Sequence, residues 1–227
     1  MKIASILENQ KIEKRISITP EIAKKYISLG FDVSISENYG SHLGIKDEEY
    51  KDLGVTTSND EKEIINNADI IVQLGLLSDD KNSLLRENQT FIGVLNPYDN
   101  KDKIDNLVKK KINTFSLELL PRITRAQSMD ILSSQANLAG YKAVVESFAN
   151  FEKVIPMMMT AAGTVPAAKV LVIGAGVAGL QAIATAKRMG AIVFATDVRM
   201  ASKEQVESLG GKFLTVEDAE NLETEGG

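Results

Sequence analysis

The chain has 227 residues, and at roughly 100–200 residues per domain this length suits one large domain or two modest ones. Hydrophobic residues make up 44% of the sequence and charged residues 25%, which is typical of a folded globular protein and not of a disordered one. The net charge of −5 offers no basic surface for a polyphosphate backbone, so we expect no nucleic-acid binding. With no cysteine and one histidine, disulfides, thiolate chemistry and a metal site are not expected either.

The N-terminal stretch from Met1 to Glu8 lacks the long apolar core and the small-residue cleavage site of a secretory signal, so we expect a cytoplasmic protein. The longest uncharged stretch, residues 170–186, contains three glycines and is shorter than the ~20 residues of a membrane-spanning helix. We therefore expect no direct insertion into a membrane.

Short apolar runs alternate with helical patterns through the first half of the chain. Strands are predicted at residues 2–7, 31–36, 69–74, 90–94 and 112–117. Helices are predicted from the Thr19-Pro20-Glu21 start to Gly30, over 47–53, over 60–67 with Asp60 as its cap, and over about 102–111. Strands that alternate with helices of this length form βαβ units, so we expect a mostly parallel sheet covered on both faces.

The alternation of strands and helices is interrupted at residues 118–134. These residues are polar and follow neither the two-residue period of a strand nor the 3.6-residue period of a helix, so a functional loop is predicted there. A connecting helix is predicted over 137–148, a buried strand over 170–173, a helix over 177–189 ended by Gly190, a strand over 191–196, a helix over 203–209 and a third strand around 212–215. We thus predict an α/β protein with two Rossmann-like domains and parallel sheets, over residues 1–132 and 133–227. A dinucleotide-binding sheet has two βαβαβ halves, so the second domain is expected to be truncated at the C-terminus and the chain to be a fragment or one half of a split protein.

A glycine-rich turn follows the apolar strand that begins at Val170. Gly174, Gly176 and Gly179 form the pattern G-x-G-x-x-G between this strand and the next helix. The first glycine permits a tight turn, the second lets a pyrophosphate approach the backbone, and the third lets the helix pack on the strand. Val177 and Ala178 complete the turn, where backbone N–H groups and the helix dipole favour an anion. The turn therefore predicts a dinucleotide site.

Asp197 ends the next predicted strand, 23 residues beyond Gly174. A carboxylate at this point can accept hydrogen bonds from the adenosine ribose and would repel a 2′-phosphate, so the sequence favours NAD over NADP. Arg199 could hold a 2′-phosphate in principle, but behind Asp197 we interpret it as a solvated side chain.

The residues in and around the polar loop resemble those of one particular protein family. The segment from Leu119 to Gln135, together with residues 156–164, 195–199 and 204–211 and the glycine turn, resembles the NAD(H)-binding subunit of proton-translocating NAD(P) transhydrogenases, in the alanine dehydrogenase-like family. The resemblance covers the N-terminal domain and the beginning of the NAD domain of that subunit, and is strongest over residues 117–213. It implies that the loop residues Arg122, Gln127, Asp130 and Ser133 surround the nicotinamide end of NADH, with Arg122, Asp130 and Ser133 binding the cofactor and Gln127 reaching toward a second nucleotide.

The resemblance also implies partners, a location and an activity. We expect hydride transfer between NADH bound here and NADP(H) bound on a partner domain, with the Re/Si-specific, proton-translocating chemistry of that enzyme class. The partners would be membrane-spanning and NADP(H)-binding subunits, without which the chain would be inactive. A homodimer at the cytoplasmic face of a bacterial inner membrane is expected.

Two positions separate this interpretation from an amino-acid dehydrogenase. The alanine dehydrogenases of this family use a lysine and a histidine in the first domain to hold and protonate a keto acid, whereas this chain has Gln73 and Asn96 at the corresponding strand ends. Neither amide can act as an acid or base near neutral pH, and hydride exchange between two nicotinamides needs none. Gln73 also departs from the usual lysine of transhydrogenases. The alternatives are a non-catalytic NAD-binding module and, less favoured, an alanine dehydrogenase-type oxidoreductase.

Two further features receive structural interpretations. His42 lies in a turn and is expected to be a solvated loop side chain. The methionines at residues 157–159 lack helical spacing and are expected to fill the core at an interdomain cleft.

Overall fold

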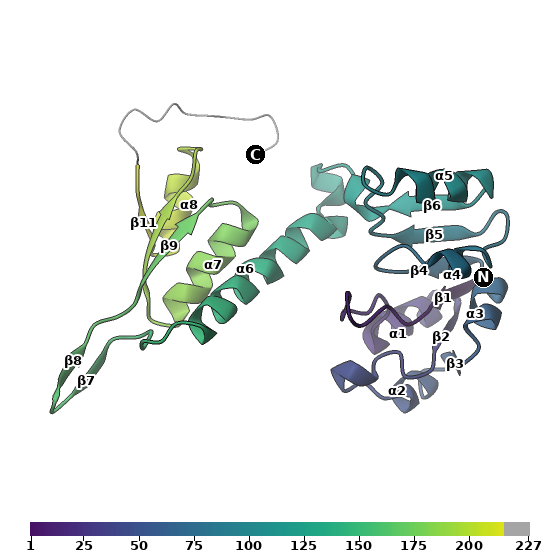
Figure 1. The fold of residues 1–227 in the computed structure, drawn as a ribbon, viewed down its shortest axis with the longest axis horizontal. Helices are drawn as coiled ribbons and strands as arrows, with labels where there is room; N and C mark the ends of the chain where they lie inside the picture. The colour runs from purple at the N-terminus through teal and green to yellow at the C-terminus, as the bar shows by residue number, and fades with distance from the viewer. Residues whose placement is uncertain (216–227) are drawn as a thin grey trace. The chain divides into compact units, whose positions relative to one another are not determined.

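The computed structural model describes residues 1–215, and the chain divides into two compact units, Met1–Asp130 and Ile131–Gly227. Each unit is an α/β layer structure, as the alternating pattern predicts (Figure 1). In the part of the chain that is described, no helix is long and apolar enough to cross a bilayer.

Unit 1 is built on six parallel strands. They are β1 (Lys2–Ser5), β2 (Asp32–Ser36), β3 (Thr56–Ser58), β4 (Ile70–Val72), β5 (Thr90–Gly93) and β6 (Asn113–Ser116). The helices are α1 (Pro20–Ser28), α2 (Asp47–Lys51), α3 (Glu61–Asn67), α4 (Asp79–Asn82) and α5 (Lys101–Lys109), with short 3₁₀ helices at Ser41–Leu43, Leu117–Leu119 and Thr124–Met129. The strand order β3-β2-β1-β4-β5-β6 is that of a doubly wound Rossmann sheet, which changes direction between β1 and β4.

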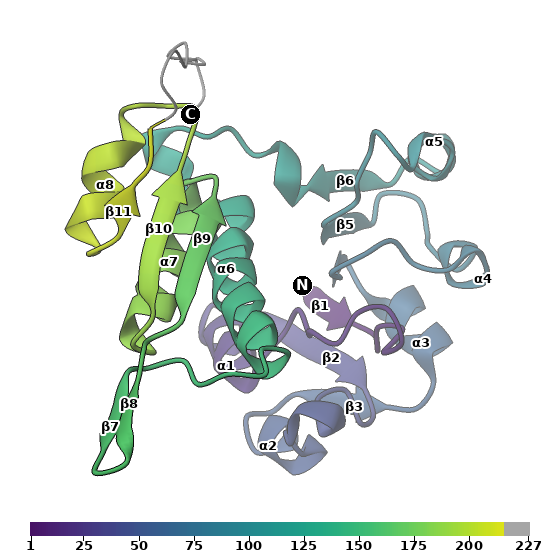
Figure 2. The same cartoon turned by 60° about the vertical axis from the view of Figure 1, so that its left-hand side comes forward.

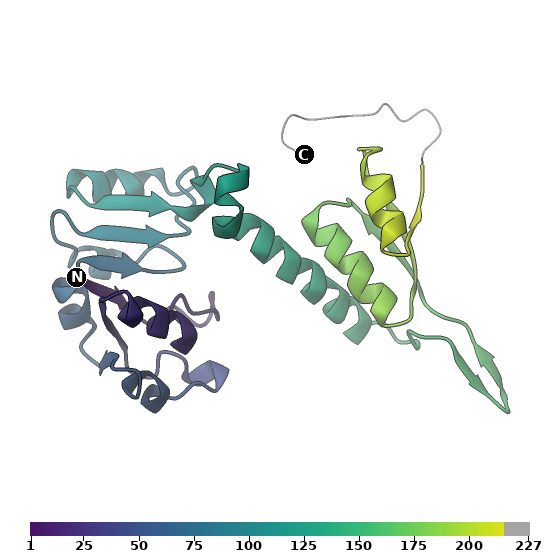
Figure 3. The same cartoon turned by 180° about the vertical axis from the view of Figure 1, so that it is seen from behind.

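Side chains that point alternately to the two faces of the sheet in unit 1 form two hydrophobic cores, one on each face. On β1, Ile3 packs on one face with residues of α1 and α2, and Ala4 packs on the other with residues of α3 and α5. Successive side chains of a strand point to opposite faces, so both faces of the sheet are covered by helices (Figure 3). The predicted covered parallel sheet is confirmed.

Helix boundaries in unit 1 follow from local capping chemistry. The Thr19 side chain accepts a hydrogen bond from Ile22 N at the start of α1, and Gly30 follows the helix with φ +85°. At α3, the Asp60 carboxylate accepts from the backbone N–H groups of Lys62 and Glu63. These capping predictions are confirmed.

Unit 2 contains a smaller parallel sheet and a hairpin. The sheet has the order β11-β10-β9, from β9 (Lys169–Ile173), β10 (Ile192–Thr196) and β11 (Lys212–Phe213). Its helices are α6 (Ile131–Ala149), α7 (Val177–Arg188) and α8 (Ser202–Ser208). The antiparallel hairpin joins β7 (Met158–Thr160) to β8 (Gly163–Val165) and extends away from the helices of the unit (Figure 2).

The prediction that residues 170–173 form a buried strand is wrong for half of their side chains. Val170 and Val172 of β9 pack into the core with α6 and α7, but Leu171 is 56% exposed and Ile173 is 80% exposed. A continuous apolar run predicts a strand covered on both faces, whereas the helices of unit 2 cover one face within the described residues.

The methionines of residues 157–159 do not fill a core. Met158 and Met159 belong to β7, and Met159 is 74% exposed. The flexible, apolar methionine side chain fills irregular cores and also lines adaptable contact surfaces, and composition alone does not distinguish the two.

The polar loop is more regular than predicted, and several short elements, among them β3, α4 and the hairpin strands β7 and β8, were not predicted from the sequence. Residues 124–129 form a 3₁₀ helix, and α6 begins at Ile131, six residues before the predicted start. After Ile131 and Leu132, the polar residues 133–135 interrupt the apolar spacing that marks the helix further along. Strand β3 and helix α4 are missed because both are short and made of polar residues.

Candidate functional site

The glycine turn connects β9 to α7 in unit 2 as predicted. Gly174 has φ +93°, a conformation that residues with a Cβ rarely adopt, and its N–H donates to Thr196 O at 2.8 Å. Gly179 faces the turn so closely that a Cβ there would lie 1.8 Å from Gly174 O. These two glycines are therefore required by the fold of the turn itself.

Gly176 differs from its neighbours because space is open around it. It is the N-cap of α7, and an added Cβ would find only the Arg199 Nη2 atom, at 3.8 Å. The backbone N–H groups of Val177, Ala178 and Gly179 lie in the first helical turn and have no acceptor within the helix. Open backbone in front of these donors fits a pyrophosphate and the positive end of a helix dipole.

Asp197 follows β10 and binds the glycine turn through its carboxylate. Its Oδ2 atom accepts from Ala175 N at 2.6 Å, and its Oδ1 atom accepts from Arg199 N at 2.8 Å. The carboxylate is 6% exposed. Hydrogen bonds from Arg199 and from the Ala175 and Arg199 backbone hold the pKa of Asp197 down, to about 2, against the effect of burial. Asp197 is therefore an anion at neutral pH.

Arg199 is not the solvated side chain that we expected. Its Nε atom lies 3.1 Å from Asp197 Oδ1, its Nη2 atom lies 3.3 Å from Asp197 Oδ2, and the side chain is 28% exposed. The guanidinium is thus fixed beside the glycine turn. The sequence signal for this contact is the spacing of an acid and an arginine two residues apart directly after a strand.

The predicted loop residues divide between the two units. In unit 1, the Arg122 Nε atom lies 3.8 Å from Asp130 Oδ2, so the predicted polar pair is present, with Arg122 more exposed than Asp130. Gln127 lies exposed on the 3₁₀ helix between them in sequence. Ser133 lies in the first turn of α6 in unit 2 and is half-buried.

Gln73 and His42 have defined partners in unit 1. Gln73 is 3% exposed; its Oε1 atom accepts from Ser5 Oγ at 2.6 Å and from Ile6 N at 2.9 Å, and its Nε2 atom donates to Ile6 O at 3.2 Å. His42 is exposed, but its Nε2 atom lies 2.7 Å from Lys14 O and its Nδ1 atom lies 3.1 Å from Gln10 Nε2. The histidine therefore connects two loops and is not merely solvated.

Comparison with known proteins gives a consistent result along the chain. Residues 6–139 match the family model for the alanine dehydrogenase/PNT N-terminal domain, and residues 143–225 match the model for the alanine dehydrogenase/PNT C-terminal domain. The chain is 49% identical to the NAD(P) transhydrogenase alpha subunit (its first polypeptide) of Rhodospirillum rubrum and 50% identical to that of Rickettsia prowazekii (strain Madrid E). The alignments cover all of this chain and 61% and 60% of those proteins.

Solved structures agree with the sequence matches. The crystal structure of transhydrogenase from Sinorhizobium meliloti superposes with a TM-score of 0.91 at 48% identity, covering 96% of this chain and 62% of that one. An L-alanine dehydrogenase shares the fold, with a TM-score of 0.81 at 20% identity over 94% of this chain and 60% of that one. The chain thus spans about three fifths of the length of these relatives. With both family models matched along nearly its whole length, the chain belongs to the alanine dehydrogenase/PNT family.

Proposed function

We propose that the chain is the NAD(H)-binding part of a proton-translocating, Re/Si-specific NAD(P) transhydrogenase. The observation that carries the proposal is the open backbone at Gly176, in front of the N-terminal turn of α7 and beside Asp197. Relatives that cover the whole chain at about half identity are named as NAD(P) transhydrogenase subunits, which favours this activity within the family.

In the proposed function the chain binds and orients one nicotinamide dinucleotide. The first turn of α7 would donate N–H groups to the pyrophosphate, and Asp197 would face the adenosine ribose. The ion pair of Arg122 and Asp130, with Ser133, would position the nicotinamide end. The bound NADH supplies the hydride, and an exchange between two nicotinamide rings requires only that their reacting carbons be held close and aligned.

The remaining parts of the proposal concern the assembly. NADP(H) would bind to a partner domain, and membrane-spanning subunits would couple hydride transfer to proton movement. The chain would then lie at the cytoplasmic face of a bacterial inner membrane and be inactive alone. We further propose a homodimer, because the exposed methionine-rich hairpin β7–β8 offers an apolar ribbon that a second copy could cover.

Gln73 supports hydride exchange over amino-acid oxidation. Its amide accepts two hydrogen bonds and donates to Ile6 O and to Glu8 Oε1, the last at 3.2 Å, so no donor or acceptor capacity remains for a substrate. An amide that is saturated by its own fold cannot hold and protonate a keto acid.

Gln127→Asn tests the positioning role of the loop. One methylene shorter, the variant should bind NADH with nearly unchanged affinity, yet hydride transfer in the complex reconstituted with its partner subunits should slow by about a hundredfold, because small misalignment of two reacting rings is costly. The measurements are an equilibrium NADH titration and stopped-flow hydride transfer.

Gly176→Val is the contrasting variant. Because space is open at this Cβ position, the protein should fold with an unchanged Tm, while the branched side chain blocks the pyrophosphate and abolishes NADH binding.

Unchanged hydride transfer in Gln127→Asn would contradict the positioning role. A reconstituted wild-type complex that binds NADH but transfers no hydride would favour the non-catalytic module, and oxidation of alanine would favour the dehydrogenase.

Asp197→Ala tests the choice of nucleotide. Removing the carboxylate should weaken NADH binding by roughly 1–3 kcal/mol, the cost of lost charged hydrogen bonds. It should also release Arg199 from its ion pair, so that NADPH gains relative to NADH. In the double variant Asp197→Ala/Arg199→Gln this relative gain should disappear. Titrations of the complete subunit with both nucleotides measure the ratio, and equal discrimination by wild type and Asp197→Ala would refute the assignment.

A further inference from the structure

The Asp197 carboxylate, which would accept hydrogen bonds from the adenosine ribose, is already fully hydrogen-bonded within its own chain. Its Oδ1 atom accepts from Arg199 N at 2.8 Å and from Arg199 Nε at 3.1 Å. Its Oδ2 atom accepts from Ala175 N at 2.6 Å and from Arg199 Nη2 at 3.3 Å. An ionised carboxylate can accept at about four lone-pair sites, so these donors use its whole accepting capacity.

The donors to Asp197 differ in how easily they can leave. Ala175 N and Arg199 N are backbone groups, held in place by the glycine turn and by the chain that follows β10. The guanidinium of Arg199 belongs to a long side chain with many rotamers. The Asp197 side chain is 6% exposed and the Arg199 side chain 28% exposed. A ribose hydroxyl group can therefore reach a free lone pair of Asp197 only if the Arg199 side chain moves.

The Arg199 guanidinium lies beside the glycine turn as well as beside the carboxylate. An added Cβ at Gly176, the N-cap of α7, would find Arg199 Nη2 at 3.8 Å. A guanidinium donates through a planar fork that matches the two oxygens of a carboxylate. One side chain thus makes the kind of paired contact that the adenosine ribose would make in the proposed function.

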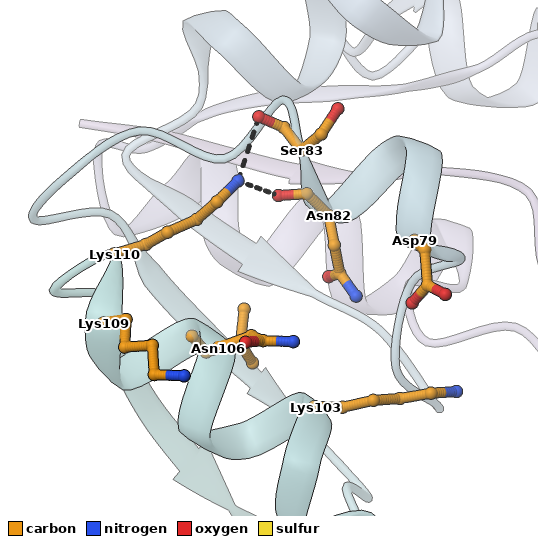
Figure 4. Close-up of a pocket in the computed structure, with 8 residues that line it drawn as sticks. Asp79, Asn82, Ser83, Lys103, Asn106, Lys109 and Lys110 are labelled. Atoms are coloured by element: carbon orange, nitrogen blue, oxygen red, sulfur yellow. Dashed lines mark hydrogen bonds between the residues drawn. The ribbon is translucent and has the colours of Figure 1, made fainter.

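Lys110 of unit 1 is a cation whose contacts conflict with no proposed ligand. Its Nζ atom donates to Asn82 O at 2.8 Å and to Ser83 O at 3.0 Å, and so joins the end of α5 to the end of α4 (Figure 4). Both acceptors are backbone carbonyls at the end of a helix, where they have no partner within the helix. Arg199 differs because its acceptor is the group that the proposed function assigns to the ribose.

We propose that Arg199 competes with the adenosine ribose for Asp197 and is displaced when NADH binds. This inference rests on the proposed function, because it takes the carboxylate as the ribose acceptor. On binding, hydroxyl groups of the ribose take the lone pairs that the guanidinium leaves, while Ala175 N and Arg199 N keep theirs. The free energy needed to break the ion pair is lost from NADH binding, so Arg199 lowers the affinity.

Equilibrium titrations of the complete subunit with NADH test the competition. Arg199→Ala should tighten NADH binding by about threefold to fivefold, because a partly exposed ion pair no longer has to be broken. Arg199→Lys should tighten it less, since an ammonium group keeps the charge but not the planar fork. Arg188→Ala is the matched control: it removes the same charge from the exposed last turn of α7 and should leave the affinity unchanged.

The Asp197→Ala background separates competition for the carboxylate from a general effect of charge. In that background Arg199→Ala should give no gain in affinity, because no carboxylate remains for which the two groups compete. NMR of the Arg199 Nε–H group in the wild-type protein follows the displacement directly. Its signal should change at saturating NADH, as the hydrogen bond to Asp197 Oδ1 breaks.

The outcomes separate this inference from the proposed function. Unchanged or weaker NADH binding by Arg199→Ala, an equal gain in the Asp197→Ala background, or an Nε–H signal that saturating NADH leaves unchanged would each overturn the competition alone. A complete wild-type subunit that binds no NADH would overturn the proposed function and the competition together.

Discussion

Gln73 and Glu8 meet at the carboxyl ends of β1 and β4, where the sheet of unit 1 changes direction. Doubly wound sheets bind ligands at this point, but here the polar groups satisfy one another. The Ser5 hydroxyl, 2.6 Å from Gln73 Oε1, is also 2.7 Å from the Tyr39 hydroxyl, and Leu74 N donates to Glu8 Oε1 at 2.7 Å. The side chains thus join neighbouring strands instead of presenting a site.

Glu8 makes the stability of this network depend on pH. Burial raises the pKa of Glu8 above its usual value of 4.5, against the hydrogen bonds from Leu74 and Gly75. A carboxyl group with a raised folded-state pKa binds its proton more tightly in the folded protein, so its contribution to stability declines as the pH rises above 4.5.

We therefore expect Glu8→Gln to raise the Tm at pH 7 and to change it little at pH 4. The neutral amide avoids burial of a charge, and its oxygen can still accept from Leu74 N. Calorimetric melts at the two pH values measure the difference. Glu49→Gln on the exposed side of α2, which accepts from Lys46 N, is the control for losing a carboxylate elsewhere. A lower Tm at pH 7 for Glu8→Gln would contradict the assigned cause.

At the scale of elements, the contact of α6 with α7 determines where the dinucleotide turn lies. Gly140 of α6 packs against the first turn of α7 so closely that an added Cβ would lie 2.0 Å from Ala178 O. Val144, one turn further along α6, is buried in the same core. The absence of a side chain at Gly140 therefore allows the backbones of the two helices to approach.

Gly140→Ala should lower the free energy of unfolding by about 1–3 kcal/mol, the usual cost of forcing atoms into a packed contact. A loss of stability would identify the close helix contact as the cause, because helix propensity alone would make the alanine variant more stable than the glycine protein by roughly 1 kcal/mol. NADH binding should also weaken, because the displaced turn contains Ala178. Urea denaturation and NADH titration measure the two effects. Ser147→Ala, an exposed substitution on the same helix, should change neither.

For the molecule as a whole, the hairpin β7–β8 matters because the described part of its own chain leaves its apolar side chains exposed. Met157, Met158, Met159 and Val165 are all exposed, and a two-stranded ribbon by itself is marginally stable in water. Burial against a second copy would supply the missing apolar contact. In the proposed homodimer the hairpin is therefore part of the interface.

Met159→Asp should shift the protein from dimer toward monomer, because burial of an unpaired carboxylate in an interface is costly. Sedimentation equilibrium over a range of protein concentrations measures the dissociation constant. Ile12→Asp, at an apolar side chain exposed in unit 1, is the matched control and should leave it unchanged. The same dissociation constant for wild type and Met159→Asp would exclude the hairpin from the interface.

The features of this protein that depend on local backbone chemistry could be predicted from its residues. The caps at Thr19 and Asp60, the left-handed glycines at the ends of helices and the glycine turn depend on residues close in the chain, and so do the alternating patterns that predict a parallel α/β sheet.

Which faces are covered and which polar groups meet depend on contacts between segments far apart in the chain, so these features required the three-dimensional fold. The apolar run at β9 predicts a buried strand and the methionines of residues 157–159 were expected in a core, but burial depends on whether another element packs there, and both segments are partly or wholly exposed. The ion pair of Asp197 with Arg199 could be suspected from spacing, but the bond from Ala175 N to the same carboxylate could not. Gln73 contacts Ser5, 68 residues away, because the two strands are neighbours in the sheet, and a periodic pattern carries no information on such pairs.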